Sequence, residues 1–240
     1  MAKVYFYNHQ GLGDHLACSG IYRFKAETSE MCVIPVVANY LPDLKRIFSD
    51  LENVIFLPLT PPLTFIKMET IGEILKKFKF EIVKLGYFGK DFRTNPNLRC
   101  DENFYLQANV PHAYRWDKFN FERNYEKENR LKELLVTSNE PYIFIHEDPK
   151  RKFIIERKYF NSDLKIVSPR IDLSSQFTIF DYLSIIENAT EIHCIESSFS
   201  ILLDNINLPV SKFIHRYARP EAKFDYTYEF TYRSQWMIFK

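Results

Sequence analysis

Apolar and polar positions follow two different periods along the first third of the chain. Short apolar runs predict four strands, and apolar positions three and four residues apart, such as Leu44, Ile47 and Phe48, predict the helices between them. The predicted strands cover residues 3–7, 31–37, 54–57 and 81–85, and the predicted helices cover residues 14–26, 41–51 and 66–78. Strands that alternate with helices of this length indicate βαβ units around a mainly parallel sheet.

The second half returns to this alternation after a polar and aromatic-rich stretch of residues 86–121. The predicted strands there cover residues 142–145, 164–167, 191–195 and 210–214, and the predicted helices cover residues 123–136, 178–189 and 197–206. The tail from residue 218 onward is too aromatic for a free tail, so we expect it to pack back on the body, with a crossing to the first half as one option. We therefore predict an α/β protein of two Rossmann-like halves, residues 1–120 and 121–240.

Composition excludes several classes of protein. Lys and Arg total 32 against 31 for Asp and Glu, and this balance argues against a nucleic-acid binder, which is usually basic on one face. No apolar run approaches the roughly 18 residues that a membrane span needs. The four cysteines are scattered without a CxxC pair, and Met1 to Val4 do not begin a signal peptide. We therefore expect a cytoplasmic protein without an integral membrane segment.

Glycine is rare in this chain, with 6 of 240 residues, yet Gly11, Gly13 and Gly20 lie within ten residues. The cluster follows a predicted strand and begins a helix, where open α/β sheets bind ligands and helix N-termini favour phosphate. A dinucleotide fingerprint is disfavoured because Leu16 stands three residues after Gly13, where the pattern needs Gly or Ala. A Walker loop is excluded since no Gly-Lys-Ser/Thr occurs.

Asp14 ends this turn, and two roles are open for its carboxylate. It can cap the following helix, or it can act as a general base that accepts a proton from a substrate hydroxyl. Both roles coexist if the carboxylate faces a ligand. Gly11, Gly13 and His15 complete the candidate turn.

In the second half, candidate residues follow the predicted strands 142–145 and 191–195. His146 precedes three consecutive cations, of which Arg151 and Lys152 are favoured to neutralise a phosphate, although such a run also suits a solvated turn. Ser197 and Ser198 suit either a helix cap or a grip on phosphate oxygens. Glu196 can bind a sugar hydroxyl or form a salt bridge. No histidine has metal-ligand spacing, so we expect neither a catalytic metal nor a cofactor.

The strand, the glycine-rich turn, Gly13-Asp14 and the helix together resemble the amino-terminal motif of GT-B glycosyltransferases, especially the ADP-heptose–lipopolysaccharide heptosyltransferases. The resemblance recurs at residues 194–200, where that family has an Asp followed by small hydroxyl or Gly residues that contact the donor diphosphate. This chain has Glu196 in place of that Asp, and it is shorter than a typical heptosyltransferase.

The resemblance implies two halves that face each other across a cleft, with sugar transfer from a nucleotide-diphosphate sugar to a hydroxyl of a glycan or other acceptor. It implies that Asp14 deprotonates the acceptor without a metal. Residues of the second half would hold the diphosphate: His146, Arg151, Lys152, Glu196, Ser197 and Ser198. The alternatives are a non-catalytic nucleotide- or sugar-binding module, an assembly protein that uses its aromatic surface, and a fucosyltransferase-like GT-B enzyme.

Overall fold

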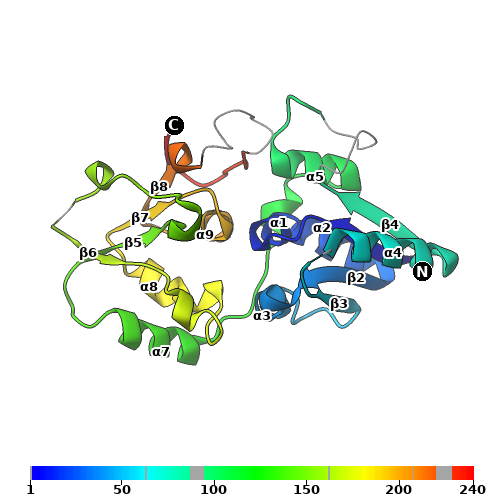
Figure 1. The fold of residues 1–240 in the computed structure, drawn as a ribbon, viewed down its shortest axis with the longest axis horizontal. Coiled ribbons are helices and arrows are strands. Elements are labelled where there is room, and N and C mark those ends of the chain that lie inside the picture. Colours follow the sequence, from blue (N-terminus) through cyan, green and yellow to red (C-terminus); the bar gives the residue numbers. More distant parts are fainter. Residues whose placement is uncertain (1, 63, 87–94, 162, 207, 220–228) are drawn as a thin grey trace. The chain divides into compact units, whose positions relative to one another are not determined.

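The computed structural model describes residues 2–62, 64–86, 95–161, 163–206, 208–219 and 229–240 (Figure 1). The chain divides into two compact units, Met1–Glu122 and Arg123–Lys240. Each unit is built around a parallel sheet of its own.

The first unit has a four-stranded sheet in the order β3-β2-β1-β4, and every neighbouring pair is parallel. Helix α4 packs on β1 and β4, and α2 packs on β2. The elements are β1 (Ala2–Asn8), α1 (Leu12–Ala17), α2 (Ser19–Thr28), β2 (Ser29–Val37), α3 (Leu41–Ile47), β3 (Val54–Leu59), α4 (Thr64–Lys77), β4 (Phe80–Leu85), α5 (Cys100–Ala108) and α6 (Tyr114–Asp117).

The second unit has a five-stranded sheet in the order β6-β5-β7-β8-β9, again with parallel neighbours throughout. Helix α7 packs on α8. The elements are α7 (Tyr125–Leu135), β5 (Tyr142–His146), β6 (Lys165–Val167), α8 (Leu183–Glu187), β7 (Glu191–Cys194), α9 (Ser198–Asn205), β8 (Ser211–His215) and β9 (Met237–Phe239).

The central strands explain why short, uninterrupted apolar runs predicted this architecture. Val4, Tyr5 and Phe6 of β1 are consecutive and fully buried, and Ile143 and Phe144 of β5 are buried in the same way. A strand covered on both faces needs apolar side chains at every position rather than at every second one. The α/β fold of two Rossmann-like halves is confirmed.

Two helical predictions need correction. The predicted helix 14–26 is two helices, because the chain turns at Cys18, whose carbonyl accepts the N–H groups of both Ile21 and Tyr22. Helix α5 was not assigned from the sequence, because its buried face carries polar Asp101 and Asn103 beside its aromatic residues. Buried polar side chains with bonding partners do not register in an apolar pattern.

The described end of the tail, residues 229–240, belongs to the second unit. Strand β9 pairs with β8, and Glu229 and Phe230 are buried. The described end of the tail thus packs on the second unit, and the crossing to the first half stays a prediction. Tyr226 and Tyr228, which share the aromatic pattern, lie outside the described residues. In the part of the chain that the structure describes, no helix has the length and apolar character to span a membrane.

Candidate functional site

Each sheet has one point where successive connections leave in opposite directions, and the candidate residues lie there. In the first sheet this point falls between β1 and β4, where Asn8 pairs with Leu85 and the glycine-containing turn begins. In the second sheet it falls between β5 and β7, where His146 pairs with Cys194. Ligands of open α/β sheets bind at the carboxyl ends of the strands at such switch points. Each unit therefore has one preferred ligand position.

Asp14 lies in the first turn of α1 and is half-buried. Its carboxylate folds back over Gly11, so that a Cβ atom at Gly11 would lie 2.6 Å from Asp14 Oδ2. Gly11 has an ordinary extended backbone, with φ of −71°. The glycine is therefore needed at this position for the close approach of a carboxylate and not for an unusual backbone angle.

The two histidines next to this turn have different surroundings. His15 is fully buried, and its Nδ1 lies 3.3 Å from both Asn8 Nδ2 and Tyr22 Oη. Burial lowers the pKa of His15 to about 3, so the ring is neutral. The ring of His9 lies near the rings of Phe65 and Phe104, with centroid distances of 6.2 and 6.1 Å. Burial lowers the pKa of His9, and the charge of Asp14 opposes that shift. His15 thus supports the turn from the interior, and the charge of the Asp14 carboxylate raises the pKa of His9.

The third glycine of the cluster has a packing role. A Cβ atom at Gly20 would lie 2.1 Å from the backbone carbonyl oxygen of Tyr114, because α2 packs closely against α6. Gly20 is therefore separate from the candidate turn. Gly13 lies inside α1, half-buried beside Asp14.

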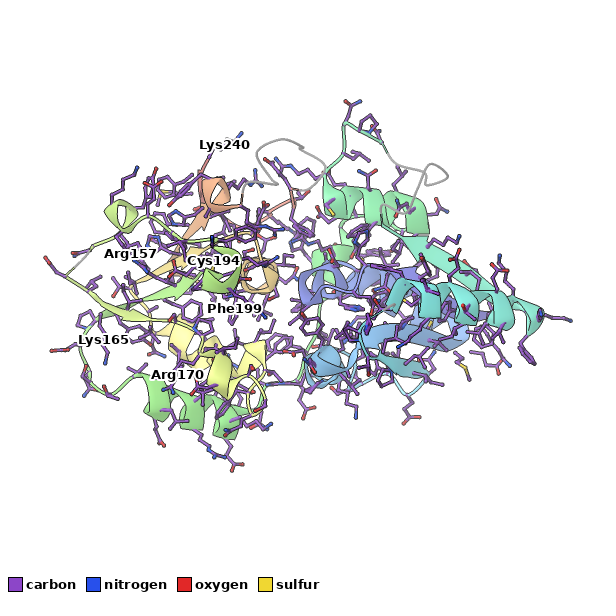
Figure 2. The ribbon with its side chains drawn as sticks, in the orientation of Figure 1. Arg157, Lys165, Arg170, Cys194, Phe199 and Lys240 are labelled. Atoms are coloured by element: carbon purple, nitrogen blue, oxygen red, sulfur yellow. The ribbon has the colours of Figure 1, made fainter. Side chains whose placement is uncertain are left out.

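At the switch point of the second sheet, His146 and Ser197 form a hydrogen bond. His146 Nδ1 lies 2.9 Å from Ser197 Oγ, although the two residues are 51 positions apart. The ring of His146 also packs against Phe199 of α9, with centroids 4.5 Å apart; Figure 2 labels Phe199 and, at the end of β7, Cys194. Burial lowers the pKa of His146 to about 4; the charge of Asp148 opposes this shift, and the charge of Arg151 adds to it.

Hydrogen bonds between Ser197 and Ser200 fix the start of α9. The Ser197 N–H donates to Ser200 Oγ at 2.9 Å, and the Ser200 hydroxyl donates to the Ser197 carbonyl at 2.9 Å. A neutral histidine ring has one N–H donor and one acceptor nitrogen, so the bond between His146 and Ser197 forms with either residue as the donor. His146 thus brings one ring N–H and one ring acceptor to the N-terminal turn of an eight-residue helix.

The predicted cations lie on a tight turn after β5. Arg151 donates from Nε to Asp148 Oδ2 at 2.7 Å, and its guanidinium lies 4.8 Å from the Phe153 ring centre. Lys152 is exposed and has a left-handed backbone conformation, with φ of 63°. Arg151 is thus held by an exposed ion pair, which water screens and a phosphate can compete for.

Glu196 is buried, with an exposed fraction of 1%, and takes part in an ion pair. Its Oε1 accepts from Arg216 Nη2 at 3.2 Å and from the Phe230 N–H at 3.0 Å. Burial raises its pKa, and the charge of Arg216 opposes that shift. Of the two roles that the sequence left open, the structure supports the salt bridge. Ser198 is half-buried at the first position of α9.

Two arginines that follow β8 were not predicted from the sequence. Arg219 donates to the Glu196 carbonyl at 2.7 Å, and its guanidinium lies 5.8 Å from the Phe153 ring. This arginine therefore connects the turn after β5 with the residues before α9, and Arg216 binds both Glu196 and Glu229. Their position just after a parallel strand is the signal that could have identified them. Among the residues described, no three His, Cys, Asp or Glu side chains gather as metal ligands.

No protein-family model and no curated protein matches this chain. Among solved structures, the chain is similar to a glycosyl transferase family 9 protein from Veillonella parvula DSM 2008, with a TM-score of 0.59 over 99% of this chain and 86% of that chain. The chain has a GT-B-like fold. The sequence identity to that protein is 11%. The fold resemblance to glycosyltransferases is confirmed, and the cleft between the halves stays a prediction.

A second similar structure is the ADP-heptose lipopolysaccharide heptosyltransferase II of E. coli. Its TM-score is 0.46 at 10% identity, and the match covers 90% of this chain and 84% of that chain.

Proposed function

We propose that this protein is a glycosyltransferase that moves a sugar from a nucleotide-diphosphate sugar to an acceptor hydroxyl. The observation that carries the proposal is the group of donors at the switch point of the second sheet. The His146–Ser197 hydrogen bond lies there at the N-terminus of α9, with Arg219 bound to the preceding carbonyl. Hydroxyl and N–H donors at a helix N-terminus, close to a cation, suit the oxygens of a diphosphate.

In this proposal the second unit holds the donor. The first N–H groups of α9 and the hydroxyls of Ser197 and Ser198 bind one phosphate, and His146 donates from its ring N–H. The side chains of Arg151 and Lys152 turn toward the phosphate and bind its oxygens as negative charge grows on the departing diphosphate. Cationic side chains then do the work that a metal ion does in metal-dependent enzymes, so we propose metal-independent transfer.

The first unit supplies the base. As the acceptor oxygen bonds to the anomeric carbon, the bond from that carbon to the diphosphate breaks and the acceptor proton passes to Asp14. The carboxylate of Asp14 lies in the first turn of α1, where the helix N-terminus favours a negative charge. Against the larger effect of burial, the charge of this carboxylate raises the pKa of the neighbouring His9 ring.

The proposal is tested by incubating the protein with a panel of nucleotide sugars, and by comparing the wild type with Asp14→Asn. We expect one nucleoside diphosphate and its sugars to raise the melting temperature of both proteins, since ligand binding stabilises the folded state. Turnover of that sugar nucleotide should fall about 100- to 10,000-fold in Asp14→Asn, the usual contribution of a general base.

The matched control is Asp43→Asn, which removes another carboxylate in the first turn of a helix, α3, in the same unit. Its turnover should stay near that of the wild type. Equal turnover by Asp14→Asn would remove the base assignment, and binding without turnover by the wild type would instead support a non-catalytic module. A panel without any thermal shift would favour an assembly protein.

A further inference from the structure

The C-terminal segment of residues 229–236, here called the strap, is bound to the far end of α9. The carboxylate of Asp204 accepts the backbone N–H groups of Arg233 and Ser234, the latter at 2.9 Å. It also accepts the Ser234 hydroxyl at 2.8 Å and Trp236 Nε1 at 3.2 Å. One buried carboxylate therefore fixes the strap to the last turn of the helix.

The strap is also bound to the N-terminal end of α9. The Phe230 N–H donates to Glu196 Oε1 at 3.0 Å, immediately before the helix, and Tyr232 Oη lies 3.0 Å from Ser200 Oγ. Arg216 closes this attachment, since it donates to Glu229 at 2.6 Å and to the Phe230 carbonyl at 3.2 Å. The strap thus follows the whole length of the helix.

The contact between Tyr232 and Ser200 has a defined direction. The single proton of the Ser200 hydroxyl goes to the Ser197 carbonyl at 2.9 Å, and its oxygen accepts the Ser197 N–H at 2.9 Å. Tyr232 is then the donor in the remaining bond. The guanidinium of Arg216 lies 6.0 Å from the centre of the Tyr232 ring and helps to hold it.

We infer that the strap positions the N-terminal turn of α9, and that Tyr232 is a positioning residue for the diphosphate through Ser200 and Ser197. The hydroxyl of Ser200 is bonded to both the N–H and the carbonyl of Ser197, so a shift of Ser200 moves the residue that contacts His146. For its ligand this inference rests on the proposed function. For the turn itself it rests on the hydrogen bonds alone.

The test is Tyr232→Phe, which removes one hydroxyl and keeps the ring. We expect the dissociation constant for the nucleoside diphosphate that binds the wild type to rise about fivefold, the effect of one hydrogen bond. Hydrogen exchange of the peptide covering residues 197–204 should accelerate by a similar factor, while the melting temperature changes little. The matched control is Tyr142→Phe. It removes a hydroxyl that donates to the Ile185 carbonyl, and Tyr142 lies on β5, next to the edge of the sheet that is opposite to β9.

The two readouts separate the inference from the proposed function. Unchanged exchange in Tyr232→Phe overturns the positioning role whether or not a nucleotide binds. Faster exchange with an unchanged dissociation constant overturns the link to the diphosphate. Faster exchange in a protein that binds no nucleoside diphosphate at all overturns the proposed function and leaves the strap as a support of the helix. Equal loss of affinity in Tyr142→Phe overturns the assignment to Tyr232.

Discussion

At the scale of single residues, the position of the Asp14 carboxylate depends on the glycine at position 11. The Asp14 carboxylate occupies the space in which a side chain at Gly11 would lie. A side-chain carboxylate can rotate away at little cost, unlike a backbone carbonyl. Alanine at this position therefore leaves the fold intact and displaces the proposed base.

We predict that Gly11→Ala changes the free energy of unfolding by less than about 0.5 kcal/mol, because its extended backbone suits alanine. Turnover of the sugar nucleotide should fall at least about tenfold, because misplaced catalytic groups lose rate steeply. Denaturant unfolding and steady-state kinetics measure the two effects. Full activity in a stable Gly11→Ala protein would contradict the proposed position of the Asp14 carboxylate.

In the second unit, the sequence identified candidate site residues more successfully than it identified their hydrogen-bond partners. Ser197 and His146 were both candidates from the sequence, and the structure joins them by a hydrogen bond. Glu196 was a candidate as well, but its partner Arg216 is 20 residues away and was not among the predicted site residues. The type of a side chain shows what it can bond to, and packing selects which partner it meets.

At the scale of elements, two glycines inside helices of the first unit differ in what surrounds them. The Cβ position of Gly20 on α2 is blocked by a backbone oxygen of Tyr114 at 2.1 Å. At Gly72 on α4, the nearest atom would be a ring carbon of Tyr5 at 3.4 Å, which is close to ordinary contact. Helix packing therefore requires glycine in α2 and tolerates a methyl group in α4.

We predict that Gly20→Ala lowers the free energy of unfolding by about 2 kcal/mol or more, because α2 must move away from α6. Gly72→Ala should leave it unchanged or raise it by up to about 1 kcal/mol, through the better helix propensity of alanine. Urea denaturation of both variants measures the difference. Similar stabilities would show that α2 and α6 are not in close contact.

The elements themselves were predictable where apolar runs are continuous. β1 and β5 are buried on both faces, and their sequences are almost wholly apolar. α5 escaped prediction because Asp101 and Asn103 face the interior, where Asp101 is paired with Arg115. A buried ion pair is stable only with both partners in place, and local sequence does not contain that information.

At the scale of the whole molecule, the fold keeps several histidines neutral. Burial lowers the pKa of His15 and His215 to about 3 and that of His146 to about 4, and it lowers the pKa of His193 as well. In the unfolded chain these rings take up a proton near pH 6.5. The unfolded state therefore binds more protons, and stability is lost as the pH falls below 6.5.

We predict that the free energy of unfolding decreases from pH 7 to pH 5, and that His15 alone accounts for about 2 kcal/mol of this decrease. His15→Asn places an uncharged acceptor near the position of Nδ1, and it should reduce the difference between the two pH values by that amount. Denaturant titrations at both pH values measure it. An unchanged difference would show that His15 titrates alike in the folded and unfolded states.

The sequence by itself determined the α/β class, the two halves, and the position of Asp14 and Ser197 after strands, because these follow from local periodicity and short spacing. The tertiary structure decided the strand orders and therefore where the connections reverse. It also decided which polar groups meet, such as Ser197 with His146 over 51 residues and Tyr232 with Ser200 over 32. Periodicity constrains neighbours along the chain, whereas partners this distant are brought together by the order of the strands and the packing of the helices on them.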